Sequence, residues 1–338
     1  MKNLSTKQLT SVTWLAAFAL TQAVGPAQEV KAAAVTNKPT APALLPGKGL
    51  AQHDFFYAGE AKTRDMYIVK NGQVAWAYHD DAGKGEISDA VRLSNGNILF
   101  AHQFGVTLIS PEKKVLWNHE APPQCEIHTA QPIGTNRVIF LQNGPEPKLF
   151  VANIATGLME KELAMPVKNT NSTHGQFRHA RLTAAGTYLV THMDMGQVVE
   201  YDETGKALWS ASLPGAWSAS RLANGNTLIC GRVVREVNPQ GDTVWEFTSA
   251  DVPDYKFNSM QIATRLPNGN TLINNWVNQW NGPIDPNTAP VQALEIAPDK
   301  KIVWALRQWA NPDLGPSTTI ELLDAPSVTE HAHFGSVR

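Results

Sequence analysis

Short apolar segments separated by glycine-containing turns recur along most of the chain. The unit at 219–247 has an apolar strand, the turn Asn224-Gly225, two further apolar strands, another glycine turn and a strand ending in Trp. Residues 90–100 and 263–273 closely repeat the first half of this unit. Because Asn-Gly takes positive φ at little cost, it is expected to close two-residue hairpins between antiparallel strands. Such self-similarity within one chain predicts a repeat architecture built of four-stranded units.

Tryptophans mark the last strand of most units. The long gap between the second and third of them holds two units, and the intervening unit, which begins near Thr129, has Leu158 or Met159 where Trp is expected. The chain therefore contains about six units of four strands. The tryptophans are Trp76, Trp117, Trp209, Trp245 and Trp304.

The two ends of the repeat array complement each other. The first unit, around 55–76, lacks its first strand, and residues 318–323 form a lone strand after the last unit. A C-terminal strand that completes the N-terminal unit closes a ring and removes exposed strand edges. We therefore predict an all-β fold, a six-bladed β-propeller of four-stranded blades whose ring is closed by the C-terminal strand.

The N-terminal segment is typical of a bacterial secretory signal. Lys2 and Lys7 precede an apolar stretch at 14–20, and small residues follow. The stretch is too short to span a membrane, and no similar run occurs later. We expect a periplasmic or secreted protein with no membrane span. The expected segments are a signal peptide and cleavage region at 1–34, a flexible leader at 35–50, one propeller domain at 51–326 and a C-terminal tail at 327–338.

Composition narrows the range of partners. A formal net charge of −2, from 28 basic and 30 acidic residues, provides no basic field for a phosphate backbone, so nucleic acid is not an expected partner. The 43% hydrophobic content suffices for a large core. Cys125 and Cys230 are the only cysteines, and we interpret them as two separate, partly buried thiols.

The constant place of the tryptophans in the repeat favours packing between blades over a ligand cage. The Asn-Gly-Asn-Thr-Leu-Ile units, the segment 233–237 and the Val-Trp pairs resemble propellers of the pyrroloquinoline-quinone-like superfamily, and also arylsulfotransferase-type propellers. The resemblance covers nearly the whole mature chain and implies the fold more than the activity. A quinone cofactor would follow from the superfamily, but the chain has no adjacent cysteines, and we predict no cofactor.

Polar side chains gather where first strands start and second strands end. These positions reach the same face of a propeller, next to the central channel. The mixture of carboxylates, imidazoles, guanidinium groups and spare aromatic rings is typical of a small-molecule site; the alternative is a polar channel that only holds water. The predicted residues are Glu86, Glu126, His128, Arg178, His179, His192, Asp194, Trp217, Arg232, Gln261, Asn275 and Trp276.

The predicted catalytic residues are His128, His179 and His192, because imidazole serves as a general base, nucleophile or metal ligand near neutral pH. None of them has a metal-binding spacing, and we predict no metal site. Arg178 and Arg232 suit a carboxylate or sulfate. The remaining predicted residues are expected to bind the ligand, with Trp217 and Trp276 stacking on a sugar or aromatic ring.

Three functions remain open. The first is a lyase or hydrolase acting on an anionic carbohydrate or other small molecule. The second is an arylsulfotransferase-like enzyme, in which the resemblance implies a histidine that accepts sulfate; Phe177-Arg178-His179 and residues 216–218 match that site only in part. The third is a non-catalytic scaffold that binds a protein partner through loops such as 278–287. His331 and His333, in the tail, are expected to be solvated.

Overall fold

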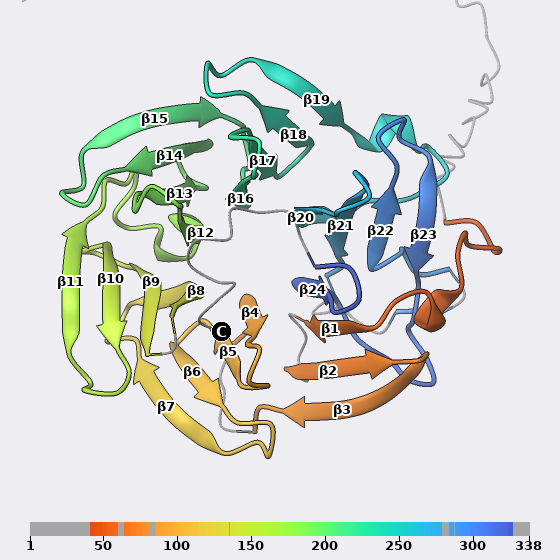
Figure 1. The fold of residues 1–338 in the computed structure, drawn as a ribbon, viewed down its shortest axis with the longest axis horizontal. Coiled ribbons are helices and arrows are strands. Elements are labelled where there is room, and N and C mark those ends of the chain that lie inside the picture. Colours follow the sequence, from red (N-terminus) through yellow and green to blue (C-terminus); the bar gives the residue numbers. More distant parts are fainter. Residues whose placement is uncertain are drawn as a thin grey trace, which may run out of the picture. The chain divides into compact units, whose positions relative to one another are not determined.

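The computed structural model describes residues 41–59, 64–81, 85–134, 136–278, 284–286 and 288–326, all within one compact unit. The expected signal region, the start of the leader, most of the loop at 278–287 and the C-terminal tail lie outside the described residues. The described part contains six four-stranded antiparallel sheets arranged as a ring of blades (Figure 1). The predicted six-bladed propeller is confirmed.

Within each blade, four strands lie side by side from the channel outward. Blade 1 has, in that order, β24 (Thr319–Leu322), β1 (Phe55–Ala58), β2 (Asp65–Lys70) and β3 (Gln73–His79). Blade 2 has β4 (Asp89–Arg92), β5 (Ile98–Ala101), β6 (Gly105–Ile109) and β7 (Val115–Glu120). Blade 3 has β8 (Glu126–Ile133), β9 (Arg137–Asn143), β10 (Lys148–Asn153) and β11 (Met159–Ala164).

The second half of the ring repeats this order. Blade 4 has β12 (Phe177–Leu182), β13 (Tyr188–His192), β14 (Gln197–Tyr201) and β15 (Ala207–Ser212). Blade 5 has β16 (Ser218–Arg221), β17 (Thr227–Cys230), β18 (Val234–Val237) and β19 (Thr243–Phe247). Blade 6 has β20 (Ser259–Arg265), β21 (Thr271–Trp276), β22 (Ala293–Ile296) and β23 (Ile302–Leu306).

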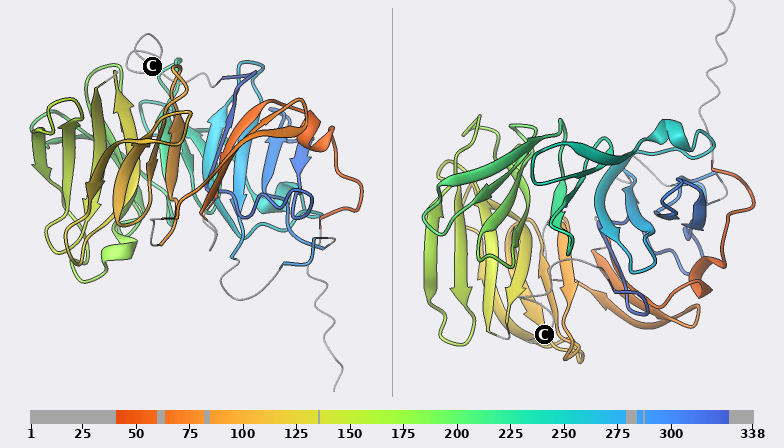
Figure 2. Two further views of the ribbon diagram at one scale, coloured as in Figure 1. Left: turned by 90° about the horizontal axis from the view of Figure 1, so that it is seen from below. Right: turned by 45° about the horizontal axis from the view of Figure 1, so that its top comes forward.

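The strands run from one face of the ring to the other (Figure 2). We call the face where the innermost strands begin the start face, and the face where they end the turn face. Three short 3-10 helices, η1 (Gly49–Ala51), η2 (Thr173–Gly175) and η3 (Ser249–Asp251), are the helices of the described residues. In this part of the chain, no helix has the length and hydropathy needed to cross a bilayer.

The ring is closed by β24, as the sequence predicts. Each residue of β1 pairs on one side with β2 and on the other with β24, for example Tyr57 with Tyr67 and with Ile320. The innermost strand of blade 1 therefore comes from the opposite end of the chain to its other three strands. Both edges of β1 are therefore paired, and blade 1 has the same four-stranded make-up as the other blades.

The Asn-Gly turns differ in detail from the prediction. In the first turn, Leu93 N donates to Asn97 O (2.8 Å) and Gly96 N donates to Leu93 O (2.9 Å). The loop therefore has three residues rather than two, with only the glycine at positive φ (88°). Asn95 has a different role, because its Oδ1 accepts the backbone N–H of Asn97 (3.0 Å). This is a type I turn followed by a left-handed glycine.

The tryptophans lie between blades but do not end their strands. Each stands inside the outermost strand, opposite the third-strand residue that precedes a bulge, as Trp209 stands opposite Glu200. Arg221 of the next blade donates from Nη2 to Glu200 Oε2 (2.5 Å), and its guanidinium lies 5.4 Å from the centroid of the Trp209 ring. The trio of Arg265, Glu236 and Trp245 repeats this contact one blade later. The tryptophans therefore pack between blades, as the repeat indicates.

The register corrects the position of the missing tryptophan in blade 3. Lys161 stands opposite Val151, immediately before the bulge, which is the position that Trp occupies in the other blades. Met159 lies one pair further along, opposite Ala152, so the prediction of Leu158 or Met159 was wrong by two residues or more. The turn accounts for the error, because Asn153 N donates to Leu158 O across four residues, whereas the equivalent turns of blades 2, 4, 5 and 6 have three. Lys161 Nζ lies 5.6 Å from the centroid of the Tyr188 ring in the next blade, so a cation replaces the tryptophan there.

Residues 41–50, the described part of the expected leader, pack against blade 6. Ala41 is buried in a cluster with Leu294 and Ala305. Ala305 N donates to Pro46 O (3.1 Å), and Trp304 Nε1 donates to Gly49 O (2.9 Å). These contacts hold the segment along the outer strand. The main core clusters lie between neighbouring blades, and both Cys125 and Cys230 are buried free thiols.

Candidate functional site

The innermost strands place one residue from each blade at equivalent positions around the channel. In the ladders, Ala90, Ala130, Ala180, Ala219, Ala263 and Ile320 pair with equivalent second-strand residues. Counting two residues back from each gives a ring of side chains near the start face. Its members, in blade order from blade 2, are Ser88, His128, Arg178, Trp217, Gln261 and Thr318.

Bulges in three blades turn these residues out of the ladder. The register shifts between Ile127 and Ala130 in β8, and it shifts at the equivalent points of β12 and β20. A bulge leaves its extra residue unpaired and redirects side chains. The residues inside the three bulges are His128 with Thr129, Arg178 with His179, and Gln261 with Ile262. Four of the predicted site residues are therefore bulge residues.

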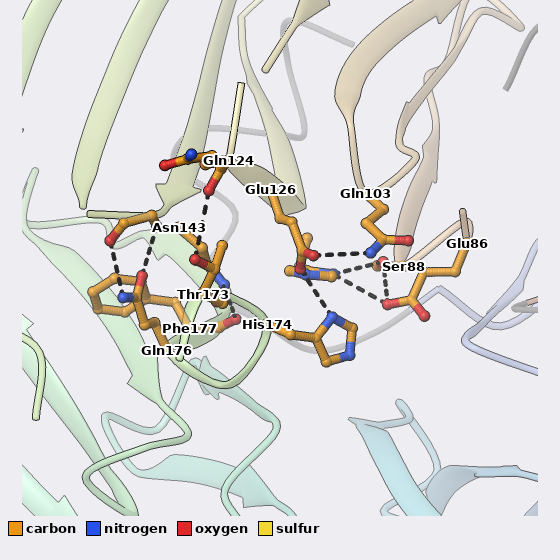
Figure 3. A network of polar contacts seen from close by, with 12 residues as sticks. Glu86, Ser88, Gln103, Gln124, Glu126, Asn143, Thr173, His174, Gln176 and Phe177 are labelled. Atoms are coloured by element: carbon orange, nitrogen blue, oxygen red, sulfur yellow. Dashed lines mark hydrogen bonds and ion pairs between the residues drawn. The ribbon is translucent and has the colours of Figure 1, made fainter. Parts of the chain in front are cut away.

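Six polar residues from blades 2, 3 and 4 form a connected group at the start face, which we call the rim cluster (Figure 3). His128 lies at its centre. Its Nε2 is 2.8 Å from Glu126 Oε2, and its Nδ1 is 2.9 Å from Ser88 Oγ and 3.2 Å from Glu86 Oε1. The members of the rim cluster are Glu86, Ser88, Gln103, Glu126, His128 and His174.

Glu126 joins the two imidazoles of the rim cluster. Its Oε2 also lies 2.9 Å from His174 Nδ1, while Gln103 Nε2 donates to its Oε1 (3.0 Å). Burial alone would raise the pKa of the Glu126 carboxyl, but the hydrogen bonds from His128, His174 and Gln103 outweigh it and hold the pKa well below its usual range. Glu126 is therefore an ionised carboxylate with hydrogen bonds at both of its oxygens.

The loop that carries His174 is anchored by neighbouring side chains (Figure 3). Asn143 Nδ2 donates to Thr173 O (3.0 Å), and the buried amide of Gln176 bonds to both backbone groups of Gly144. His174 itself is exposed, whereas His128 is buried. The rim cluster thus reaches solvent on the side of His174. Glu86, His128 and His174 each offer one metal-ligand atom, and these atoms lie within 4.8 Å of one another.

Arg178 and Trp217 follow His128 around the ring. The Arg178 guanidinium carbon lies 4.6 Å from the centroid of the Trp217 ring, so the two side chains stack. Arg178 is buried and Trp217 is half-buried. The structure therefore brings together two predicted ligand-binding residues, as a cation–π pair that follows His128 around the channel.

A cavity of about 410 Å³ occupies the channel on the other side of this ring. It extends from Asp89, His179 and Ser218 toward the turn face, where Leu266 and Pro326 line it. All six innermost strands contribute to its wall. The cations that line it are Arg92, Arg181 and Arg221, and the carboxylates are Asp89 and Glu321.

An ion pair stands at the inner end of the cavity. Arg181 Nη1 and Nη2 donate to the two oxygens of Asp89 at 3.0 and 3.2 Å, and Thr129 Oγ1 also donates to Asp89 (2.8 Å). Burial raises the pKa of Asp89, but Arg181 and His179 more than offset it, so the pKa is lowered. Asp89 is therefore ionised and paired.

His179 lies beside this ion pair and lines the cavity. Burial lowers its pKa to about 3; nearby Asp89 opposes the shift, while Arg181 and Arg178 add to it. The imidazole is uncharged near neutral pH. Its Nε2 is buried, and no group in the described ranges forms a hydrogen bond with it.

Other predicted residues lie outside both groups. His192 is inside blade 4, where its Nε2 is 2.8 Å from Tyr201 Oη and its ring packs on Phe177. Asp194 accepts from the backbone N–H groups of Lys168 and Asn169.

The remaining predicted residues belong to blades 5 and 6. Asn275 Nδ2 donates to Lys256 O, which comes before the first strand of blade 6, and to Val291 O, which comes before the third. Arg232 is exposed and Trp276 is half-buried. Gln261 is buried in its bulge, with neither side-chain amide atom hydrogen-bonded within the described residues.

The sequence did not single out Ser88, Gln103, His174, Asp89 or Arg181. Ser88 and Asp89 stand at a first-strand start and Gln103 at a second-strand end, so the repeat alignment contains them, but nothing in it distinguished them from their neighbours. Arg181 follows the aligned alanine of its strand directly, whereas Arg221 stands one position later in the equivalent strand. Because side chains alternate along a strand, Arg181 points to the channel and Arg221 to the neighbouring blade. His174 lies in a loop without a counterpart in the repeat, so no sequence signal marked it.

Comparisons with known proteins show a β-propeller. No protein-family model and no curated protein sequence matches the chain. A solved structure of a protein of unknown function from Bacteroides caccae is similar over 79% of this chain and 97% of that chain, with 23% identity and a TM-score of 0.68.

Two further solved structures share the fold at lower identity. Catalytically inactive virginiamycin B lyase from Staphylococcus aureus, with quinupristin, matches 78% of this chain and 89% of its own, with 11% identity and a TM-score of 0.52. The WD40 β-propeller domain of Doa1 matches 64% and 70%, with 15% identity and a TM-score of 0.51. The resemblance to pyrroloquinoline-quinone-like and arylsulfotransferase-type propellers stays a prediction.

Proposed function

We propose that the protein binds an anionic small molecule, in the class of sugar acids, inside the channel cavity. The observation that carries this proposal is that His179 lines the cavity and that its buried Nε2 has no hydrogen-bond partner in the described part of the chain. A buried polar atom without a partner costs free energy that a ligand hydrogen bond can recover. The cavity volume of about 410 Å³ is in the range of small-molecule sites.

The cavity wall carries a guanidinium group that an anion can share. Three arginines line the cavity against two carboxylates, but Arg221 is bonded to Glu200 of the neighbouring blade, and Arg92 occupies the same repeat position and borders Trp76 between blades 1 and 2. Arg181 instead reaches the channel, where it pairs with Asp89 next to His179. A carboxylate that meets Arg181 and His179 would be compensated by both. The apolar residues between them suit the C–H faces of a sugar ring.

Binding of an anion would also change the chemistry of His179. A carboxylate near the imidazole stabilises its protonated form and raises its pKa from about 3. With a pKa closer to the working pH, the imidazole can act as a general base, as a lyase or hydrolase would require. The lyase named among the similar structures supports this interpretation only in that the same fold carries lyase chemistry.

The proposal predicts that affinity for an acidic sugar rises as the pH falls. Isothermal titration with galacturonate should show binding that tightens between pH 7 and pH 5, with net proton uptake measured in two buffers of different ionisation enthalpy. Neutral galactose, which lacks the carboxylate, should bind at least about tenfold more weakly.

Variants separate the cavity from the start face. His179→Asn should remove the proton uptake, and Arg181→Gln should weaken galacturonate binding about tenfold. Arg232→Ala, which removes an exposed arginine outside the cavity wall, is the matched control and should change neither. Equal affinity for galactose, or galacturonate binding that both cavity variants leave unchanged, would contradict the proposal.

A further inference from the structure

We propose that the rim cluster is a binding site for one divalent first-row transition-metal ion, held by Glu86, His128 and His174. These three residues offer ligand atoms within 4.8 Å of one another, from two blades and the η2 loop. Two imidazoles and one carboxylate form a donor set that protein sites use for zinc, iron, manganese and cobalt. The site is separate from the channel cavity, because none of its three ligands lines that cavity.

Glu126 supplies the supporting contact that metal-binding histidines need. Such histidines usually direct their second ring nitrogen to a carboxylate, which fixes the ring orientation and raises its basicity. Here Glu126 Oε2 is 2.8 Å from His128 Nε2 and 2.9 Å from His174 Nδ1. An ion would therefore take Nε2 of His174 and Nδ1 of His128, where it would replace the present contact with Ser88 Oγ (2.9 Å). One carboxylate thus orients both imidazoles.

The other contacts of the rim cluster fit the same assignment. The edge of the His128 ring that carries Nδ1 points to Glu86, and Nδ1 and Glu86 Oε1 are 3.2 Å apart. Ser88 Oγ donates to the same Glu86 oxygen (3.1 Å), and Gln103 holds the other oxygen of Glu126. Each carboxylate is therefore oriented by a neutral donor. Two carboxylates, Glu86 and Glu126, surround the imidazoles, and a divalent cation that replaces imidazole protons would balance their charge.

The geometry requires only a small contraction around an ion. Metal–ligand bonds of about 2.0–2.2 Å place the ligand atoms of one ion about 3–4 Å apart. The present 4.8 Å limit is slightly wider, and His174 is the member that can close the gap, because its side chain is exposed on a loop. Three protein ligands leave at least one coordination position open toward solvent. An ion bound here would therefore have room for a water or an exogenous ligand.

The ion should be a transition metal and not magnesium or calcium. Magnesium and calcium prefer oxygen ligands, whereas two of the three donors here are imidazole nitrogens. Zinc and cobalt(II) are therefore the probes of choice, and magnesium is the comparison. Cobalt(II) also reports its coordination directly, through visible absorbance that changes when nitrogen ligands bind.

The test uses the full-length protein, stripped of metal by chelation and dialysis, in a background with His331→Ala and His333→Ala. These substitutions remove a histidine pair in the tail that would bind zinc by itself. Titration with ZnCl₂ and with CoCl₂ should show one equivalent bound with micromolar or tighter affinity. His174→Ala and Glu86→Gln should each weaken binding about 100-fold, and Glu126→Gln about 10–100-fold.

His79→Ala is the matched control. His79 is an exposed histidine at the end of the outermost strand of blade 1, paired with Asp65 (2.8 Å) and Asp81 (3.3 Å). This variant should bind zinc like the background protein. Circular dichroism and the melting temperature establish that each variant is folded. The proposal is overturned if zinc and cobalt do not bind, if binding survives both His174→Ala and Glu86→Gln, or if magnesium binds more tightly than zinc.

Discussion

At the scale of single residues, burial decides what each histidine can do. His128 contacts two carboxylates, and His179 stands near an ion pair. His192 is enclosed by Phe177 and Tyr201. All three were candidates for the same catalytic role in the sequence, because side chains of one type look alike there. Their different surroundings arise from which strand and which side of the blade each one occupies.

His192 should make the protein less stable in mild acid. Burial lowers its pKa to about 4, whereas an unfolded histidine has a pKa near 6.5. Between these values the unfolded chain binds the proton and the folded chain does not. The free energy of unfolding should therefore fall by up to about 3 kcal/mol as the pH decreases from 6.5 to 4.

His192→Phe should flatten this pH dependence. Urea unfolding at pH 7.5 and pH 4.5 measures it, and the variant should show a smaller difference between the two conditions than the unmodified protein. Tyr201→Phe is the control, because it removes the same hydrogen bond and keeps the imidazole. Its pH dependence should stay. A His192→Phe protein with the full loss of stability in acid would show that another group is responsible.

At the scale of the strands, a bulge and a bridge between blades have different roles. Bulges in the innermost strands turn His128, Arg178 and His179 out of the ladder, so the site residues are available to the channel. The bridge formed by an arginine, a glutamate and a tryptophan fastens neighbouring blades. Arginines of the repeat therefore serve the fold at Arg221 and the channel at Arg181.

Arg221→Ala should destabilise the protein by about 2–3 kcal/mol. The substitution leaves Glu200, whose side chain is 15% exposed, without its guanidinium partner, and it uncovers one face of Trp209. Arg137→Ala removes an exposed pair with Glu160 and should cost less than about 1 kcal/mol. Chemical unfolding compares the two variants. A similar loss in both would mean that the bridge adds nothing beyond a surface ion pair.

At the scale of the whole molecule, the ring depends on a single strand from the far end of the chain. Tyr57 and its neighbours in β1 pair with β24 across more than 250 residues of sequence. This pairing closes the ring, and it completes the wall of the channel cavity, since Thr319, Ile320 and Glu321 line it. Strand β24 therefore takes part both in ring closure and in the candidate ligand site.

Ending the chain after residue 316 should open the ring. The shortened protein loses β24 and with it the core residues Ile320 and Leu322, which exposes the β1 edge and the core around Phe55. We expect a lower melting temperature and concentration-dependent aggregation, measured by calorimetry and light scattering. A chain that ends after residue 326 keeps β24 and should behave like the full protein. Equal behaviour of the two truncations would argue against closure by β24.

The fold could be predicted because a propeller repeats its local chemistry. Asn-Gly turns, short apolar strands and a tryptophan in the outermost strand of five blades follow from short-range preferences, and the unmatched first and last units indicated the closure. The length of the Asn-Gly turns and the tryptophan position of blade 3 were less predictable, because a left-handed glycine adds a residue to the hairpin loop and the last turn of blade 3 is one residue longer than in most blades.

The site was only partly visible for the same reason. Repeat alignment identified Glu86, Glu126 and His128, which the structure brings into one cluster. His174 joins them from a loop outside the repeat, and His192, at a second-strand end, faces the interior of its blade instead.

The sequence by itself determined the number of blades, their strand content, the closing strand and the columns that line the channel, since these depend on periodic, local preferences. Only the tertiary structure decided which column residues meet, which face a cavity and which are enclosed. Those outcomes depend on contacts between blades about forty or more residues apart, such as Ser88 with His128 and Asp89 with Arg181, and on bulges that redirect single side chains.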